Sequence, residues 1–286
     1  MEDKYYYKII IIIMINNSHS YKYIYIDGTN QSGSKGTDLS QGTTFRTGIK
    51  LQYIDMIYIL TLENSNRLSN NRLYELHNFN ITIQVNKGYK NCKKNLYKQT
   101  SIYDINDAFY HCFLHANNMN YKNIMILEDD FQFDNINILN ILNEIGSFIN
   151  NNKYDIYHLG PVMHFSVPFT FKHHRCLFMQ SAHSCIYSIN YINYYIEKYN
   201  NKLTQRNDML WNDINIIKYK YYRPVCYQLF PETENQKDWT NIFITLFIKF
   251  FKLDKYYFPG YIIFNIVSYL ILLLIIIFIA HIINYI

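Results

Sequence analysis

Cysteine, proline and glycine are scarce in this chain of 286 residues, which contains five cysteines, five prolines and nine glycines. So few cysteines exclude a disulfide scaffold, and so little glycine and proline excludes a fibrous repeat. Charged residues make up only 17% of the chain, and the net charge of +5 is spread without any block of like charge. We therefore expect no nucleic-acid partner. The hydrophobic share of 49% is also too high for a disordered tail.

Aromatic residues are abundant but carry little information about function. The chain has 30 tyrosines, and its other common residues, isoleucine, asparagine and lysine, share A/T-rich codons with tyrosine. Base composition thus explains much of the aromatic content without sugar or base stacking. The cysteines, at positions 92, 112, 176, 185 and 226, form neither a CxxC pair nor a paired zinc spacing, which indicates a reducing compartment and leaves bridges between some of them open.

The longest apolar run extends from Ile262 to Ile283. Only Asn265, Ser268, Tyr269 and His281 interrupt it. At 1.5 Å per residue the run is about 33 Å long, enough to cross a bilayer core, so we predict a single-pass C-terminal membrane anchor. Lysines at 249, 252 and 255 precede the run and nothing basic follows it, so the positive-inside rule places the larger N-terminal part in the cytosol. A buried core helix of a globular domain is the alternative.

The N-terminal region allows two interpretations. The apolar run Ile9–Ile15 lacks a small-residue cleavage site, so we interpret it as a strand or a weak anchor; a signal peptide would invert the topology. Residues 28–48 are rich in glycine, serine and threonine and predict a linker. We therefore divide the chain into an N-terminal extension with its linker (1–52), an α/β domain (53–240), and a membrane-proximal segment with the anchor (241–286).

The central region alternates strand-like and helical stretches, the pattern of an α/β sandwich. The predicted strands are residues 56–62, 80–85, 123–127 and 154–159, and the predicted helices are residues 66–77, 105–117, 136–150 and 190–199. Residues 21–26 of the extension are also strand-like. A domain of about 185 residues buries about 70% of its unfolded surface, which is enough for a core of its own.

One face of the second predicted helix carries Asp107, His111 and His115, four residues apart. Two histidines at this spacing can hold zinc, but the glutamate of an HExxH motif is missing because Cys112 follows His111. We interpret the face as polar and solvated. Asp104 is expected to be the N-cap of this helix.

The most informative segment is an apolar strand that runs into three acids, Glu128, Asp129 and Asp130. Adjacent carboxylates repel one another, and a divalent cation offsets that repulsion. Strand alternation directs Glu128 and Asp130 to one face, at the carboxyl end of a strand, where α/β sheets bind their ligands. Carboxylates without a soft ligand suit Mg²⁺ or Mn²⁺ bound together with substrate phosphates. An acidic strand-to-helix turn without a metal is the alternative.

Leu127-Glu128-Asp129-Asp130 resembles the acidic motif of glycosyltransferase family 25, whose members glycosylate lipopolysaccharide and collagen and have relatives in large DNA viruses. Upstream, residues 57–67 resemble the opening strand and turn of that family, with Thr61 and Glu63 in place of the usual Asn and Asp. Residues 107–115 loosely resemble the helix before the acidic motif, without its Gly-Cys start or Ser-His pair. Residues 181–188, 207–213 and 223–228 resemble later segments in the family's order, so the resemblance covers about residues 56–240.

This resemblance implies a GT-A fold, a single Rossmann-type α/β domain that binds a nucleotide-sugar and transfers the sugar with inversion to a glycan, lipid or protein acceptor. The implied ligands of Mn²⁺ or Mg²⁺ are Asp130, Glu128 and His183. The implied contacts to the nucleotide-sugar are Thr61, Arg67, Glu128 and Asp129. The implied general base is Asp208, with Asp213 as the second candidate, because inversion needs a base opposite the leaving group.

Each of these roles has a structural alternative. Asp208 also suits the N-cap of a helix, Arg67 a surface position at a helix start, and His183 a hydrogen-bonded core position. Glu232 and Glu234 lie in a polar loop where an acceptor contact is a further option.

Two rival functions use other features. Residues 27–35 nearly form a Walker A loop, but Ser34 separates the second glycine from Lys35 and no amphipathic helix follows, which argues against a nucleotide kinase. A membrane-tethered scaffold that keeps the transferase fold without activity is the second rival. The departures at Thr61 and Glu63 favour it, and the retention of all three acids argues against it.

Overall fold

The computed structural model describes residues 20–26, 51–68, 73, 75–76, 79–134, 137–200, 203–228, 246, 249–252 and 258–283. Ile9–Ile15, the linker, the Walker-like segment, half of predicted helix 66–77, and Glu232 and Glu234 lie outside these residues. All five cysteines lie within them and are free thiols.

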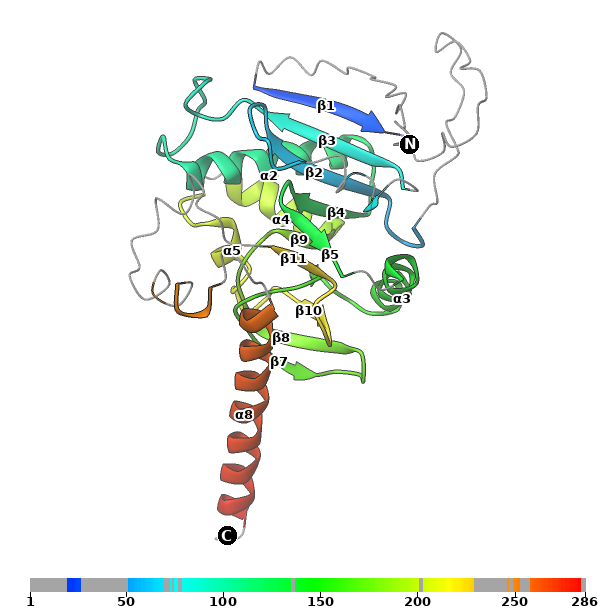
Figure 1. Ribbon diagram of the computed structural model, residues 1–286, viewed down its shortest axis with the longest axis vertical. Coiled ribbons are helices and arrows are strands. Elements are labelled where there is room, and N and C mark those ends of the chain that lie inside the picture. Colours follow the sequence, from blue (N-terminus) through cyan, green and yellow to red (C-terminus); the bar gives the residue numbers. More distant parts are fainter. Residues whose placement is uncertain are drawn as a thin grey trace, which may run out of the picture.

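A mixed sheet forms the centre of the domain (Figure 1). Its nine described strands, in spatial order, are β1 (Tyr21–Ile26), β3 (Ile81–Asn86), β2 (Met56–Leu62), β4 (Asn123–Glu128), β9 (Ser184–Ser188), β6 (Ile156–His158), β10 (Lys218–Tyr221), β8 (His173–Met179) and β7 (His164–Pro168). A separate small sheet pairs β5 (Phe131–Phe133) with β11 (Cys226–Gln228) in antiparallel fashion. The described helices are α2 (Ser101–Asn118), α3 (Ile138–Asn151), α4 (Ile189–Asn200), α5 (Asn207–Leu210) and α8 (Phe258–Ile283).

The sheet is covered on both faces, which explains why its central strand is apolar throughout. Met125 and Leu127 of β4 pack with the core under α3, whereas Ile124 and Ile126 pack with the core under α2 and α4. Strands buried on both faces appear as continuous hydrophobic runs in a sequence. The predicted α/β architecture and the four predicted strands are confirmed, with boundaries shifted by one or two residues.

Strand β1 corrects the division of the chain. It was expected in an extension outside the domain, but it pairs with β3 along its whole length, from Tyr21 opposite Asn86 to Ile26 opposite Ile81. The side chains of β1 also match the spacing of α2, because alternate residues of a strand are about as far apart as residues four apart on a helix. The strand therefore lays a row of tyrosines along one face of α2.

That row of tyrosines also overturns the interpretation of the polar face of α2 as solvated. The Tyr21 hydroxyl bonds to Asp107, and the Tyr23 hydroxyl donates to the carbonyl of His111 at 2.9 Å. The two ring nitrogens of His115 are hydrogen-bonded to Tyr58 and Tyr25, at 2.7 and 2.5 Å. Both nitrogens are thus occupied, which leaves none for zinc.

The N-cap prediction for α2 was also wrong. The helix begins at Ser101 after Thr100, so Asp104 lies within its first turn. Asp104 is buried there in an ion pair with Lys94, 2.6 Å apart, and Lys94 also donates to Asn86. An ion-pair partner ten residues earlier in the chain, rather than the helix end, accounts for the position of Asp104.

Helix α8 contains the predicted anchor. Tyr261–Ile283 is long and apolar enough to cross a membrane: its 18-residue window has a mean hydropathy of 3.1, and few residues of that window are buried against the domain. The polar residues that interrupt the apolar run lie mostly on the side that packs on the domain: the Asn265 side chain bonds to Lys220, and the Ser268 hydroxyl donates to the carbonyl of His164.

Candidate active site

Parallel strands β2, β4 and β6 end at the same edge of the sheet, called here the carboxyl edge. The ends of these strands are the expected place for a ligand in an α/β sheet. Strand β9 runs antiparallel between β4 and β6, so the residues just before it also lie at this edge, and the nitrogen of Glu128 donates to the carbonyl of His183 at 2.9 Å. The three acids after β4 are therefore placed where the sequence predicted a site.

Asp129 is fixed by the turn that follows β2. Its carboxylate accepts hydrogen bonds from Thr61 at 2.9 Å and Ser65 at 2.5 Å. Arg67 forms an ion pair with Asp129 at 3.3 Å and a second with Asp130 at 3.2 Å. Predicted residues Thr61, Arg67, Asp129 and Asp130 are thus brought together, and the two aspartates are almost fully buried although the arginine is partly exposed.

Glu128 and Asp130 converge on one amide group. The side-chain nitrogen of Gln228 lies 3.2 Å from Glu128 and 3.1 Å from each carboxylate oxygen of Asp130. Gln228 reaches this position because β11 pairs with β5, with Gln228 opposite Phe131, the residue next to Asp130. Glu128 and Asp130, which the sequence predicted to share a face, thus contact the same amide group.

The neighbouring acids alter the protonation of Glu128. Burial, together with the charges of Asp130 and Asp129, raises the pKa of Glu128 to about 8, and Arg67 and Gln228 only partly oppose this shift. Desolvation and like charge both favour the protonated carboxyl. A cation placed among the three carboxylates would reverse this shift.

The side chains present fit a hard divalent cation that is shared with a substrate. The described residues contain no group of three or more His, Cys, Asp or Glu side chains arranged to hold a metal ion alone. Mg²⁺ commonly takes only one or two carboxylates from the protein and the rest of its ligands from water and phosphate. Asp130 and Glu128 supply that number, and all of their donor atoms are oxygen.

His183 lies beside these acids in a separate set of contacts. It is fully buried, and its Nε2 is 3.4 Å from the carbonyl of Cys226 and 3.3 Å from the hydroxyl of Tyr261. Its Nδ1 is buried without a hydrogen-bond partner. Burial lowers the pKa of His183 to about 4, so the imidazole is neutral, the form that ligates metals.

Asp208 lies in the short helix α5, and Asn212, which follows this helix, contacts the end of strand β8. The Asn212 side chain accepts a hydrogen bond from the nitrogen of Met179 and donates to its carbonyl, so α5 packs against the segment that leads into β9. The carboxylate of Asp208 pairs with Arg206 at 3.4 Å and stays largely buried. It makes no N-cap bond, because the residue before the helix is Arg206.

Asp213 occupies a different environment. Its carboxylate accepts hydrogen bonds from Tyr194 at 3.2 Å and from the nitrogen of Asn215 at 3.0 Å, and these bonds lower its pKa. It lines an open surface cleft of about 570 Å³ over α4 and α5. None of Glu128, Asp129 and Asp130 lines that cleft, so Asp213 and the acidic turn do not share it.

Three residues of this arrangement were not among the predicted site residues: Ser65, Gln228 and Tyr261. Ser65 and Gln228 lie within segments that resemble the glycosyltransferase family, so a closer comparison of those segments could have found them. Tyr261 lies in the predicted membrane segment, and its hydroxyl is 3.1 Å from the backbone nitrogen of Gln228. No feature of the sequence connects an apolar helix to the acidic turn.

No protein-family model matches the chain, and no curated protein sequence matches it. Among solved structures, it is similar to apo UDP-glucose pyrophosphorylase with a TM-score of 0.35 and 8% identity, over 60% of this chain and 75% of the other. It is also similar to a glycosyltransferase involved in the glycosylation of the major capsid of PBCV-1, with a TM-score of 0.30 and 13% identity, over 56% of this chain and 72% of the other. Similarities of this size carry no weight for activity.

Proposed function

We propose that the chain is a nucleotide-sugar-dependent glycosyltransferase with a GT-A-like domain, which requires Mn²⁺ or Mg²⁺ and inverts the transferred sugar. One observation carries the proposal: Glu128 and Asp130 share the Gln228 amide at the carboxyl edge of the mixed sheet. The adjacent Asp129 is fixed by three side chains, those of Thr61, Ser65 and Arg67. The resemblance of the same segments to glycosyltransferase family 25 supports the reaction class.

In this proposal each side chain has a distinct task. A cation held by Asp130 and Glu128 would supply positive charge to the diphosphate leaving group. Arg67 extends from the buried acids toward solvent and donates charge-assisted hydrogen bonds to the diphosphate. Asp129 and Thr61 hold that arginine and the donor in position.

The acceptor hydroxyl must lose its proton as it attacks the sugar. Asp208 takes this proton on its carboxylate in our proposal, and Asp213 is the second candidate. Asp208 is favoured because its carboxylate is largely shielded from solvent, whereas the Asp213 carboxylate faces an open cleft. The acceptor is a glycan, lipid or protein.

We also propose that α8 anchors the enzyme in a membrane with its domain in the cytosol. The length and apolar character of Tyr261–Ile283 support the anchor, and the lysines upstream of it support the orientation. Protease protection in sealed membranes tests the orientation, since a shielded domain would contradict it.

The central experiment measures binding of Mn²⁺ and UDP to the full chain in detergent by calorimetry. The full chain is needed because removal of α8 would also remove Tyr261. We expect Asp130→Asn to abolish the joint binding of metal and nucleotide, and the control Asp134→Asn, an acid four residues downstream, to leave it intact. Unchanged binding in Asp130→Asn would favour the scaffold interpretation. A hydrolysis screen of nucleotide-sugars with Mn²⁺ would then identify the donor.

A further inference from the structure

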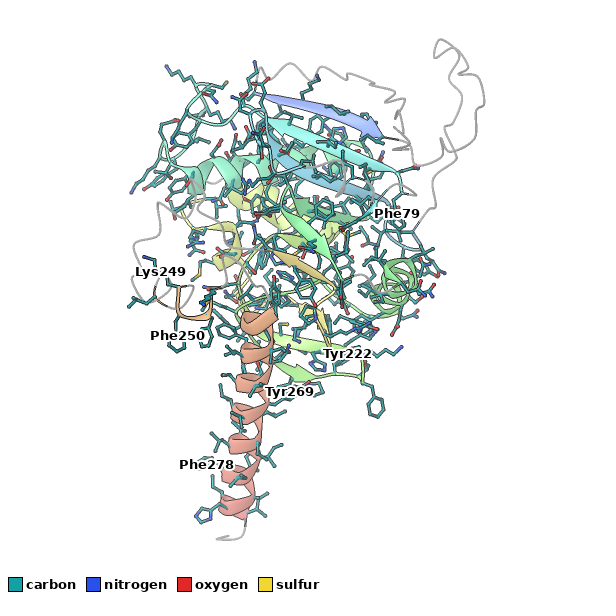
Figure 2. The ribbon with its side chains drawn as sticks, in the orientation of Figure 1. Phe79, Tyr222, Lys249, Phe250, Tyr269 and Phe278 are labelled. Atoms are coloured by element: carbon teal, nitrogen blue, oxygen red, sulfur yellow. The ribbon has the colours of Figure 1, made fainter. Side chains whose placement is uncertain are left out.

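The hairpin formed by β7 and β8 lies at the end of the domain from which α8 projects (Figure 1). The two elements are in direct contact: Asn265 is 3.2 Å from the His164 imidazole, and the Tyr269 ring is 6.0 Å from the His174 ring. Figure 2 shows Tyr269 beside this hairpin and Phe278 farther along the helix. The hairpin is therefore the part of the domain nearest to any membrane that α8 crosses.

The length of α8 indicates that the β7–β8 hairpin lies at the surface of that membrane. The window that is long enough to span, Tyr261–Ile283, includes the turns packed on β7 and β8. The described part of the helix beyond Tyr269, from Leu270 to Ile283, is only about 21 Å long, whereas a bilayer core is about 30 Å thick. A bilayer that α8 crosses therefore also surrounds the turns of α8 that pack on β7.

The tip of the hairpin presents two phenylalanines to solvent. Phe171 is 102% exposed and Phe169 is 52% exposed. The Phe169 ring lies 6.0 Å from the Phe148 ring and 5.3 Å from the Tyr219 ring, so Phe169 is only partly exposed, whereas Phe171 faces solvent fully. A tight turn fixes the tip: the nitrogens of Phe169 and Thr170 both donate to the carbonyl of His173, and the Thr170 hydroxyl accepts from the nitrogens of Lys172 and His173. Exposed aromatic side chains on a fixed turn are typical of segments that insert at a membrane interface.

The charge of this region also suits a membrane surface. The sequence contains no aspartate or glutamate between Asp155 and Glu197, a stretch that holds the whole hairpin together with Lys172 and Arg175. Lys172 pairs with Glu144 of α3, and the Arg175 guanidinium lies over the Tyr219 ring. The hairpin itself thus carries basic side chains and no acid, and Glu144 of α3 is the acid beside it. A segment of this composition is attracted to anionic lipid headgroups.

From these observations we infer that the β7–β8 tip, through Phe169 and Phe171, inserts into the headgroup region of the same bilayer that α8 crosses. This second attachment fixes the angle between domain and membrane, so that the acidic turn is held near the surface. The inference rests on the proposed membrane anchor and is independent of sugar transfer.

Site-directed fluorescence on the full chain tests this attachment. The environment-sensitive fluorophore NBD is placed at Phe171→Cys in a Cys92→Ser background, because the other four cysteines are buried. The matched control is Tyr97→Cys, a 56% exposed position in the loop before α2. Helix α2 lies in the half of the domain away from α8 (Figure 1). Because Phe171 is fully exposed, its substitution leaves the fold intact.

In vesicles of phosphatidylcholine with a minority of phosphatidylglycerol, we expect NBD at 171 to shift to the blue. We also expect nitroxide lipids to quench it at least about twofold more than at 97. Equal access of aqueous iodide to both positions would overturn the inference, as would protection at 171 without lipid quenching, which indicates a protein contact.

Extraction with alkaline carbonate separates the two possible failures. A chain that resists extraction but keeps position 171 in water retains its anchor and loses the second attachment. A chain that carbonate releases loses both. Neither result affects the binding experiment on Asp130.

Discussion

The hydroxyl of Tyr261 lies 3.1 Å from the backbone nitrogen of Gln228, which donates a hydrogen bond to it. The side chain of the same glutamine contacts Glu128 and Asp130. The first turns of the apolar helix are therefore part of the structure that supports the acidic turn. An enzyme truncated before this helix is expected to lose its site geometry as well as its membrane attachment.

The contact between Tyr261 and Gln228 can be tested by removing one oxygen atom. Tyr261→Phe leaves the Gln228 N–H without its acceptor, which costs about 1–3 kcal/mol for a buried donor. We expect a lower midpoint of thermal unfolding in detergent and weaker binding of Mn²⁺ with UDP. Tyr269→Phe, an exposed position on the same helix, is the control and should behave as the wild type. Equal midpoints for the two variants would contradict a supporting role of Tyr261.

The raised pKa of Glu128 predicts how stability depends on pH when divalent ions are chelated. With a pKa of about 8 in the folded chain against 4.5 in the unfolded one, the folded state holds one proton more between these values. Stability must therefore fall as pH rises from about 4.5 to about 8. Glu128→Gln should remove this part of the slope, and Glu63→Gln, at an exposed position, should keep it. Urea unfolding at several pH values measures it, and identical slopes in both variants would refute the assignment.

Asp208 and Asp213 can be separated by kinetics once a donor is known. Loss of a general base typically lowers the rate by about 10²–10⁴-fold, so we expect Asp208→Asn to reduce kcat by this factor with little change in donor KM. Asp213→Asn is expected to stay within about threefold of the wild type, because its carboxylate bonds to Tyr194 and Asn215 at an open cleft. The reverse pattern would transfer the role of base to Asp213.

Gly160 tests how closely β11 must approach the sheet. A Cβ at this position would lie 2.0 Å from the carbonyl oxygen of Cys226, so Gly160→Ala must displace the strand that carries Gln228. We expect a loss of stability of about 1–3 kcal/mol and a loss of Mn²⁺ and UDP binding in the protein that remains folded.

Gly146→Ala is the matched control for this prediction. Its Cβ would lie 2.1 Å from the carbonyl oxygen of Gln52, a comparable clash in another part of the fold. It should lower stability but leave binding intact. If both variants bind equally well, the position of β11 does not control the site.

The local patterns of the sequence predicted the strands and the acidic turn well. The run before Glu128 is apolar because β4 is buried on both faces, and this produces a strand signal without any knowledge of its neighbours. The three acids were likewise expected directly after this strand, and Glu128 is its last residue while Asp129 and Asp130 form the turn. Both results depend only on residues that are adjacent in the chain.

The two larger errors involve partners that are distant in the chain. The face of α2 with His111 and His115 was interpreted as solvated because the tyrosines that cover it come from β1, about 90 residues earlier. For the same reason the sequence placed β1 outside the domain. Strand pairing and side-chain networks of this kind are determined by the sheet order, which no local period contains.

Three properties of this chain could be predicted from local sequence patterns: an α/β domain, three acids after an interior strand, and an apolar segment long enough to span a membrane. These properties follow from hydrophobic periodicity and from residue type, which act over a few turns or strand positions. Three contacts are seen only in the folded chain: Gln228 joins Glu128 to Asp130, β1 pairs with β3 in the sheet, and Tyr261 of the apolar helix bonds to Gln228. Those contacts form because packing brings together residues separated by about 30 to 100 positions, where the free energy of burial and hydrogen bonding depends on the whole fold.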